Sequence, residues 1–157
     1  MNLLDVLVWG GVATVAMTVV LEVAMAMGWT RMSLPYILGT VFTSDRRLAP
    51  FLGTGLHFVN GIAFAFAYAA AFESLGRANG WTGAGLGVVH TAAILVVMPF
   101  AAGAHPRMAT EQDGPDARTA LQPPGFFALN YGRRTPLFGL LAHLLYGAII
   151  GSFYSLA

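Results

Sequence analysis

Residues 3–29 read LLDVLVWGGVATVAMTVVLEVAMAMGW, an apolar stretch with only two charged side chains, Asp5 and Glu22. A helix needs about 20 apolar residues to cross the ~30 Å hydrocarbon layer of a bilayer. Three further stretches meet this requirement: residues 51–72, 83–103 and 137–156. We therefore expect four transmembrane helices, with Trp29 and Trp81 at the ends of stretches, where indole rings favour the headgroup region.

The composition is typical of a chain whose main solvent is lipid. Of 157 residues, 57% are hydrophobic and only 10% are charged, against roughly 25% charged residues in an ordinary soluble domain. Cysteine is absent, which excludes disulfides, thiolate metal sites and cysteine nucleophiles. The net charge of +1 gives no indication of nucleic-acid binding, so we expect the lipid bilayer and no nucleic acid among the partners.

An internal repeat organises the chain. Shifting the sequence by 86 residues aligns five identical residues within nineteen positions, in the pattern Pro-x-x-Gly-x-x-x-His-x-x-x-Gly followed by a tyrosine. An arginine pair precedes the proline in both copies, Arg46-Arg47 and Arg133-Arg134. Two helices in each copy make the copies parallel, related by an axis along the membrane normal. We predict an all-α fold, a single domain over residues 1–157 that is a four-transmembrane-helix bundle made of two parallel two-helix repeats, about 3–72 and about 83–156, with a polar loop at 104–135.

The arginines indicate an orientation. Seven of the eight lie in the connections that follow the first and third stretches. By the positive-inside rule these connections are cytoplasmic and both termini lie on the opposite side. Each connection also contains a short apolar piece, residues 34–39 and 124–129, that is expected to lie in the membrane interface. Residues 109–122 are polar and are expected to form a solvated loop.

Ionisable side chains inside the apolar stretches are the candidate functional residues, because a polar group in the bilayer needs a partner. His57 and His143 occupy equivalent positions, each roughly 10 Å beyond the proline that opens its helix. Glu22 is expected roughly 10 Å inside the same membrane face. His105 is expected near that surface, whereas His90 lies roughly 20 Å from the end of its stretch, deeper than the others and apart from them.

Glycines accompany both equivalent histidines. Gly53 and Gly61 stand four residues before and after His57, and the second copy repeats this spacing around His143. Residues four apart lie on nearly the same helix face. The resulting groove of small residues can admit another helix backbone or a flat porphyrin, and the sequence does not choose between them.

The first functional hypothesis is a haem b. A pair of histidines at equal depth can present two axial imidazoles to one iron, and these are His57 and His143. Arginines nearer the cytoplasmic face can pair with the propionates, above all Arg47 and Arg134. The protein would then act in electron transfer or in cofactor handling.

The second hypothesis is a transition-metal site. Glu22, His57 and His143 supply one oxygen and two nitrogens, and His90 or His105 is a possible fourth ligand. Imidazole suits zinc, copper, iron or nickel, and the carboxylate argues for a harder ion than copper(I). Bound water would be activated if one position stayed open, so the sequence leaves enzymatic activity undecided.

A third hypothesis needs no cofactor. Glu22 and the histidines would form a hydrogen-bonded polar core that orders the bundle, forms a homo-oligomer or docks as an accessory subunit onto a larger membrane complex. The same groups would also be suited to relay protons, as buried titratable groups do in pumps and transporters. The sequence leaves these alternatives open beside the haem and the metal.

Four segments carry a resemblance to known proteins: LPYILGTVF at 34–42, GLHFVNG at 55–61, PGFFALN at 124–130 and HLLYG at 143–147. They resemble an uncharacterised family of small four-helix bacterial integral membrane proteins, over most of the chain. The resemblance implies a multi-pass topology and the inner membrane of a bacterium. It implies no activity, cofactor or functional residue.

Overall fold

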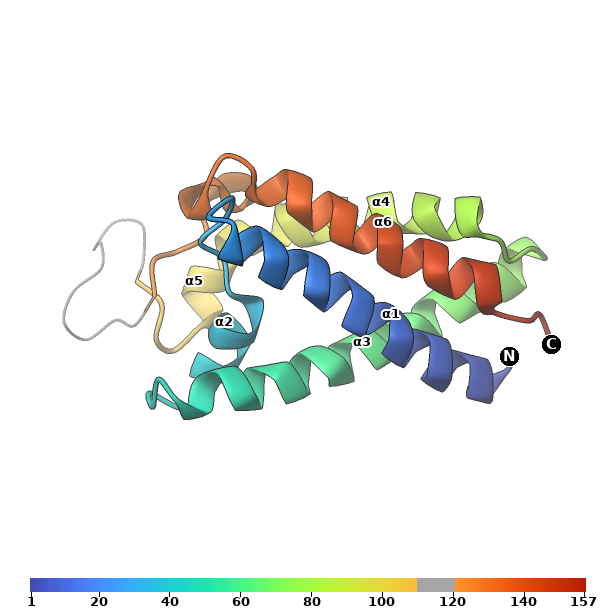
Figure 1. The fold of residues 1–157 in the computed structure, drawn as a ribbon, viewed down its shortest axis with the longest axis horizontal. Coiled ribbons are helices and arrows are strands. Elements are labelled where there is room, and N and C mark those ends of the chain that lie inside the picture. The colour runs from blue at the N-terminus through green and yellow to red at the C-terminus, as the bar shows by residue number, and fades with distance from the viewer. Residues whose placement is uncertain (110–120) are drawn as a thin grey trace. The chain divides into compact units, whose positions relative to one another are not determined.

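The computed structural model describes residues 1–109 and 121–157, and these residues form helices joined by turns (Figure 1). Four helical segments are long and apolar enough to cross a membrane. Three are α1 (Leu3–Ala26), α3 (Leu48–Leu75) and α6 (Thr135–Phe153), and the fourth is Gly80–Ala104, which begins with α4 (Gly80–Val97). The described residues confirm the predictions of an all-α fold and of four helices long and apolar enough to span a membrane. Four such helices suggest a multi-pass membrane protein in a lipid environment. The polar loop predicted at 109–122 lies almost wholly outside the described residues.

Short helical elements occupy the connections: α2 (Leu34–Thr40), η1 (Met98–Phe100), α5 (Ala101–Ala104) and η2 (Phe126–Tyr131). The helix that starts at Gly80 ends at Val97 because Pro99 has no backbone N–H to continue the ladder. Residues 34–39 and most of 124–129, predicted as interfacial pieces, thus lie in α2 and η2. Their interfacial position stays a prediction.

The described chain divides into two compact units. Unit 1 contains residues 1–23, 58–91 and 138–157, and unit 2 contains residues 24–57 and 92–137. Each unit draws residues from both predicted repeats, and each long helix contributes to both units. The two-repeat arrangement therefore stays a prediction.

Two antiparallel helix pairs build unit 1. In the α1–α3 pair, a Cβ on Gly10 would overlap the Cβ of Ala65, and a Cβ on Gly61 would overlap the side chain of Thr14. In the α4–α6 pair, a Cβ on Gly83 would overlap the carbonyl group of Gly147. Small residues of this kind let membrane helices approach closely.

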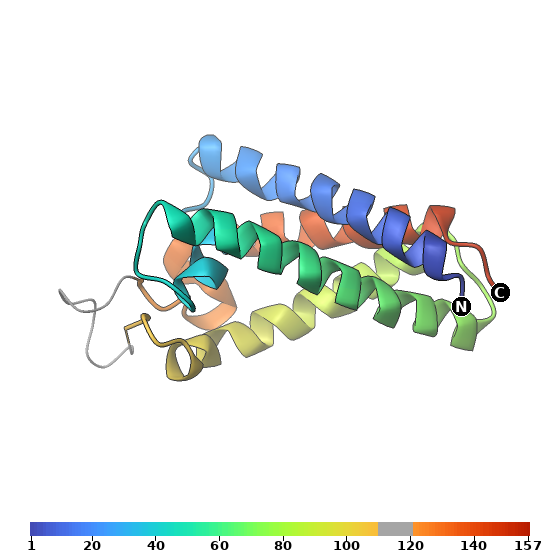
Figure 2. The ribbon, with the colours of Figure 1, turned by 90° about the horizontal axis from the view of Figure 1, so that it is seen from below.

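The two ends of the chain lie side by side in unit 1, next to the α3–α4 turn (Figure 2). Glu73 holds them there, because its Oε1 accepts hydrogen bonds from the Tyr154 hydroxyl at 2.6 Å and from the Ala157 amide at 3.1 Å. The amino group of Met1 lies 3.3 Å from the same oxygen. Glu73 therefore has a structural role at this end of the unit.

Unit 2 has its own core around α2 and η2. Buried apolar side chains form this core: Met32, Ile37, Met108, Leu121, Ala128 and Tyr131. The Tyr131 hydroxyl donates to the Gln122 carbonyl at 2.6 Å, and burial raises its pKa to about 12 although the charge of Arg31 acts in the opposite direction. Helix α2 packs backbone to backbone on the start of α3, because a Cβ on Gly53 would overlap the Pro35 carbonyl.

Candidate functional site

The register of α4 against α6 brings two histidines together in unit 1. Besides the Gly83 contact, a Cβ on Gly87 would overlap the carbonyl oxygen of His143. The backbones therefore meet one turn before His90 on α4. As a result the imidazole rings of His90 and His143 lie with centroids 4.5 Å apart, at an interplanar angle of 74°.

Two tyrosines complete this group. The Tyr68 hydroxyl lies 3.3 Å from His90 Nδ1, and the Tyr68 and Tyr146 rings meet edge to face at 5.3 Å. The Tyr146 hydroxyl donates a short hydrogen bond to the Gly61 carbonyl. We call Tyr68, His90, His143 and Tyr146 the His/Tyr cluster; its members come from α3, α4 and α6.

The tautomer of neutral His143 follows from its hydrogen bond. Its Nδ1 lies 2.7 Å from the carbonyl oxygen of Gly139. A carbonyl oxygen only accepts, so Nδ1 carries the proton and Nε2 keeps a lone pair. His143 can therefore take up a proton or bind a metal through Nε2, with its ring held by the backbone of its own helix.

Aromatic rings surround His90. Its ring centroid lies 4.0 Å from that of Phe64 and 5.9 Å from that of Tyr68. Its Nδ1 is paired with the Tyr68 hydroxyl, which either donates to it or accepts from it depending on the tautomer. The residue is half-buried.

The expectation that His90 lies apart from the other histidines is wrong with respect to His143. Its depth was counted from the end of the apolar stretch as one continuous helix, but α4 ends at Val97, and a 3-10 turn and the short α5 follow. The seven residues from His90 to Val97 correspond to roughly 10 Å of α-helix, about half of the predicted depth. The depth of His90 relative to His143 follows from the backbone contacts of Gly83 and Gly87 with α6.

The other predicted ligands have different surroundings. Glu22 is half-buried in unit 1, and His57 is buried in unit 2 with 6% of its surface exposed. Arg47 and Arg134 are exposed in unit 2. Among the described residues, no group of three or more His, Asp or Glu side chains is placed to hold a metal ion. The pairing of His57 with His143 and the ligand set with Glu22 stay predictions.

His105 has both ring nitrogens occupied in unit 2. Its Nε2 donates to the Ile37 carbonyl at 2.9 Å, and its Nδ1 accepts from the Arg107 amide at 3.1 Å. The Arg107 guanidinium then donates to the Thr40 carbonyl at 2.8 Å. This network fastens the end of α2, and it leaves His105 no lone pair for a metal in this arrangement.

The grooves around the predicted haem ligands contain protein at most positions. Beside His57, Gly53 meets the backbone of α2 and Gly61 meets Thr14 of α1. Beside His143, Gly147 meets the backbone of α4, whereas Gly139 has open space. The sequence allowed either a helix or a porphyrin beside these glycines. Protein atoms lie against three of the four glycines.

Sequence reasoning missed the tyrosines of the cluster. In the sequence Tyr68 stands out only as the tyrosine after the first copy of the repeated pattern. Tyr146 is not among the predicted site residues, although it follows His143 by three residues on one helix face. That spacing is a signal for Tyr146. The repeat marks Tyr68, but nothing in the sequence indicates its contact with His90, because that contact joins two helices.

The four apolar helices suggest a multi-pass membrane protein, and two of these helices bring a pair of histidines into contact. No protein-family model, no curated protein and no solved structure matches the chain. The family resemblance noted from the four sequence segments therefore stays an expectation.

Proposed function

We propose that this protein carries a proton-accepting centre inside the membrane, formed by His90 and His143 with Tyr68, and that it relays protons. The observation that carries the proposal is the contact of the two imidazole rings, 4.5 Å apart between centroids, in helices that otherwise consist almost wholly of apolar residues. Ionisable groups at such positions mark proton and ion pathways in membrane proteins.

The geometry suits a single proton. Two imidazolium ions in ring contact would repel each other strongly in a medium of low dielectric constant. The centre therefore holds no proton or one proton. On His143 the acceptor is the Nε2 lone pair, since its Nδ1 is already bound to Gly139. The ring contact supports transfer of this proton to His90, whose Nδ1 is hydrogen-bonded to the Tyr68 hydroxyl, through which the proton can leave.

Two measurements test this centre. Histidine-selective nitrogen NMR in nanodiscs, between about pH 4 and pH 9, is expected to show one proton taken up by the pair. In His90→Gln the signals of the remaining His143 are expected to follow one independent protonation, because its partner ring is gone. His105→Gln is the matched control and leaves the pair unchanged. Independent titration of His90 and His143 in the native protein would contradict the proposal.

Proton flux tests the relay. Proteoliposomes with an internal pH dye and an imposed gradient are expected to equilibrate faster with the native protein than with His90→Gln or His143→Gln. Tyr68→Phe should slow the flux while the pair still takes up its proton. Equal rates for the native protein and for all three variants would rule out a relay and leave the cluster a structural element.

A second candidate function rests on the tautomer of His143. A metal-bound histidine ordinarily donates its other ring N–H to a carbonyl or carboxylate, and Gly139 supplies that carbonyl at 2.7 Å. We propose haem b or a transition-metal ion as the ligand of His143 in this case. His57 would be its partner by the sequence repeat, Glu22 a possible oxygen ligand, and Arg47 and Arg134 the partners of the propionates.

An absorption spectrum and elemental analysis of the purified protein separate the two candidates. A Soret band that is lost in both His57→Ala and His143→Ala supports haem, and a stoichiometric metal without a Soret band supports the ion. A featureless spectrum without metal supports the proton centre. A stable copurifying partner together with no proton uptake would support a cofactor-free accessory subunit instead.

Topology belongs to the same proposal. The arginine distribution supports cytoplasmic connections after α1 and α4, with both termini on the other side of a bacterial inner membrane. The repeated Pro-x-x-Gly-x-x-x-His pattern supports two parallel repeats. Cysteine labelling of a single introduced residue near each end of α3, with and without a membrane-impermeant blocker, determines which side each connection faces.

A further inference from the structure

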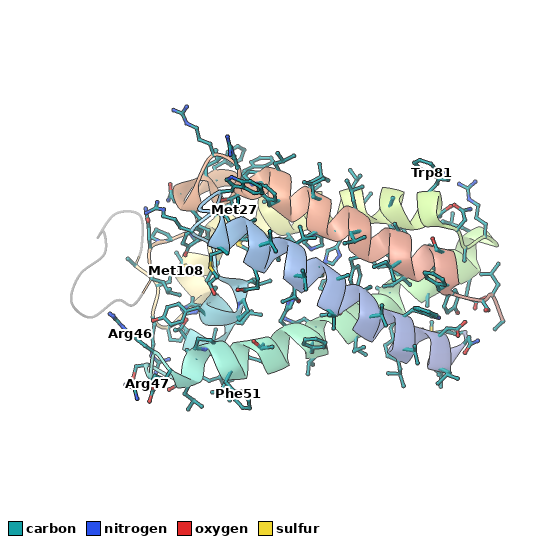
Figure 3. The ribbon with its side chains drawn as sticks, viewed as in Figure 1. Met27, Arg46, Arg47, Phe51, Trp81 and Met108 are labelled. Atoms are coloured by element: carbon teal, nitrogen blue, oxygen red, sulfur yellow. The ribbon has the colours of Figure 1, made fainter. Side chains whose placement is uncertain are left out.

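The turn before α3 presents two arginines to the outside of unit 2. Arg46 and Arg47 are exposed, and Figure 3 shows both side chains extending away from the helices. No described residue forms a hydrogen bond or an ion pair with either guanidinium. Other arginines of the unit are used differently: Arg31 donates to the Asn130 carbonyl and Arg107 to the Thr40 carbonyl. The two charges of the turn therefore lack an internal partner among the described residues.

The acid of the turn is already engaged. Asp45 Oδ1 accepts hydrogen bonds from the Arg47 amide at 2.7 Å and from the Leu48 amide at 3.2 Å. Its carboxylate thus caps the start of α3. It satisfies backbone donors, and it does not form an ion pair with the arginine side chains.

Apolar side chains stand on both sides of the arginine pair. Phe42 is 64% exposed before it, and Leu48 and Phe51 are 45% and 77% exposed after it. Large exposed aromatic side chains at the start of a spanning helix lie in the apolar edge of a bilayer. They would hold the turn at the level of the lipid headgroups.

We infer that the Arg46–Arg47 turn binds the phosphate of an anionic phospholipid. A guanidinium presents parallel N–H donors that match a phosphate in a bidentate manner. The flanking aromatic side chains contact the acyl chains of the same lipid or of its neighbours. This inference is independent of the proton centre, which lies in unit 1.

Native mass spectrometry of the full chain measures lipid retention directly. After exchange in nanodiscs of phosphatidylcholine mixed with phosphatidylglycerol, the native protein is expected to retain phosphatidylglycerol. Each of Arg46→Gln and Arg47→Gln should lower this affinity about five-fold. Arg77→Gln removes the same charge from the α3–α4 turn and serves as the matched control, with unchanged retention.

Three results would overturn the inference. Equal losses in Arg77→Gln and Arg46→Gln would indicate a general charge effect, and equal retention of phosphatidylcholine and phosphatidylglycerol by the native protein would indicate no headgroup preference. Displacement of the lipid by inorganic phosphate alone would indicate a free-anion site. The double variant Arg46→Lys/Arg47→Lys keeps both charges, and a loss of retention in it supports bidentate recognition. Full retention in this variant overturns the bidentate geometry.

Discussion

The two helix pairs of unit 1 are held together in different ways. In α4–α6 the backbones themselves touch, since Gly83 and Gly87 face carbonyl groups of the opposite helix. In α1–α3 the closest approach is between a glycine and a side chain, Gly61 and Thr14. A side chain can rotate away from an intruding methyl group, but a helix carbonyl cannot move without moving its helix.

The difference explains where the histidines lie. The α4–α6 contact fixes the register of two helices to within a residue, and the His/Tyr cluster depends on that register because His90 and His143 come from opposite sides of it. At Gly61 the α1–α3 contact tolerates small adjustments, because the Thr14 side chain can rotate. The glycine contact therefore serves the candidate site, and the threonine contact serves the stability of the unit.

The largest expected effect comes from adding a methyl group to the α4–α6 contact. Gly83→Ala is expected to lower the free energy of unfolding by about 3 kcal/mol, because the new Cβ would overlap the Gly147 carbonyl. Unfolding in mixed detergent micelles, followed by circular dichroism, measures the change. Gly85→Ala on the same helix is the control: it meets open space, and it should be neutral or slightly stabilising. Similar losses in both variants would contradict the backbone contact.

A smaller effect is expected in the α1–α3 pair. Gly61→Ala should cost about 1 to 2 kcal/mol, since its Cβ would meet the Thr14 hydroxyl and methyl groups. The double variant Gly61→Ala/Thr14→Ala should recover most of this loss, as the two closest atoms, the Thr14 hydroxyl oxygen and γ-methyl carbon, are gone. No recovery would show that the α1–α3 contact is as rigid as the α4–α6 contact, and the comparison would fail.

The hydrogen bond between Tyr68 and His90 is expected to contribute about 1 kcal/mol. A double-mutant cycle of Tyr68→Phe and His90→Phe isolates this coupling between α3 and α4. Tyr68→Phe combined with Trp9→Phe, which no described interaction joins, should be additive to within about 0.5 kcal/mol. Additivity in the first cycle would remove the hydrogen bond from the account of the cluster.

The smallest effect concerns the link between the pairs. Trp9 of α1 stacks on Phe153 of α6, with centroids 4.2 Å apart and planes 17° apart. A cycle of Trp9→Leu and Phe153→Leu should show a coupling of about 0.5 to 1 kcal/mol. A coupling larger than that of the Tyr68–His90 pair would reverse the order expected here.

Much of the fold was predictable, because hydropathy acts locally along the chain. The four predicted spans differ from α1, α3, α4 and α6 mainly at their ends, and Pro99 accounts for the largest difference, at the end of α4. The candidate site was predictable only in part. His143 was singled out by the repeat, but its contact with His90 was missed, since depth along one helix does not give the register against another.

The sequence by itself determined three features: a lipid environment, the number of helices long enough to span it, and the residue types available for chemistry. These follow from the length of the apolar stretches and from composition. Only the tertiary structure decided which polar side chains meet. That choice depends on where two backbones approach most closely, and the approach is set by pairs of small residues such as Gly83 and Gly147, distant in sequence, whose fit is a property of both helices together.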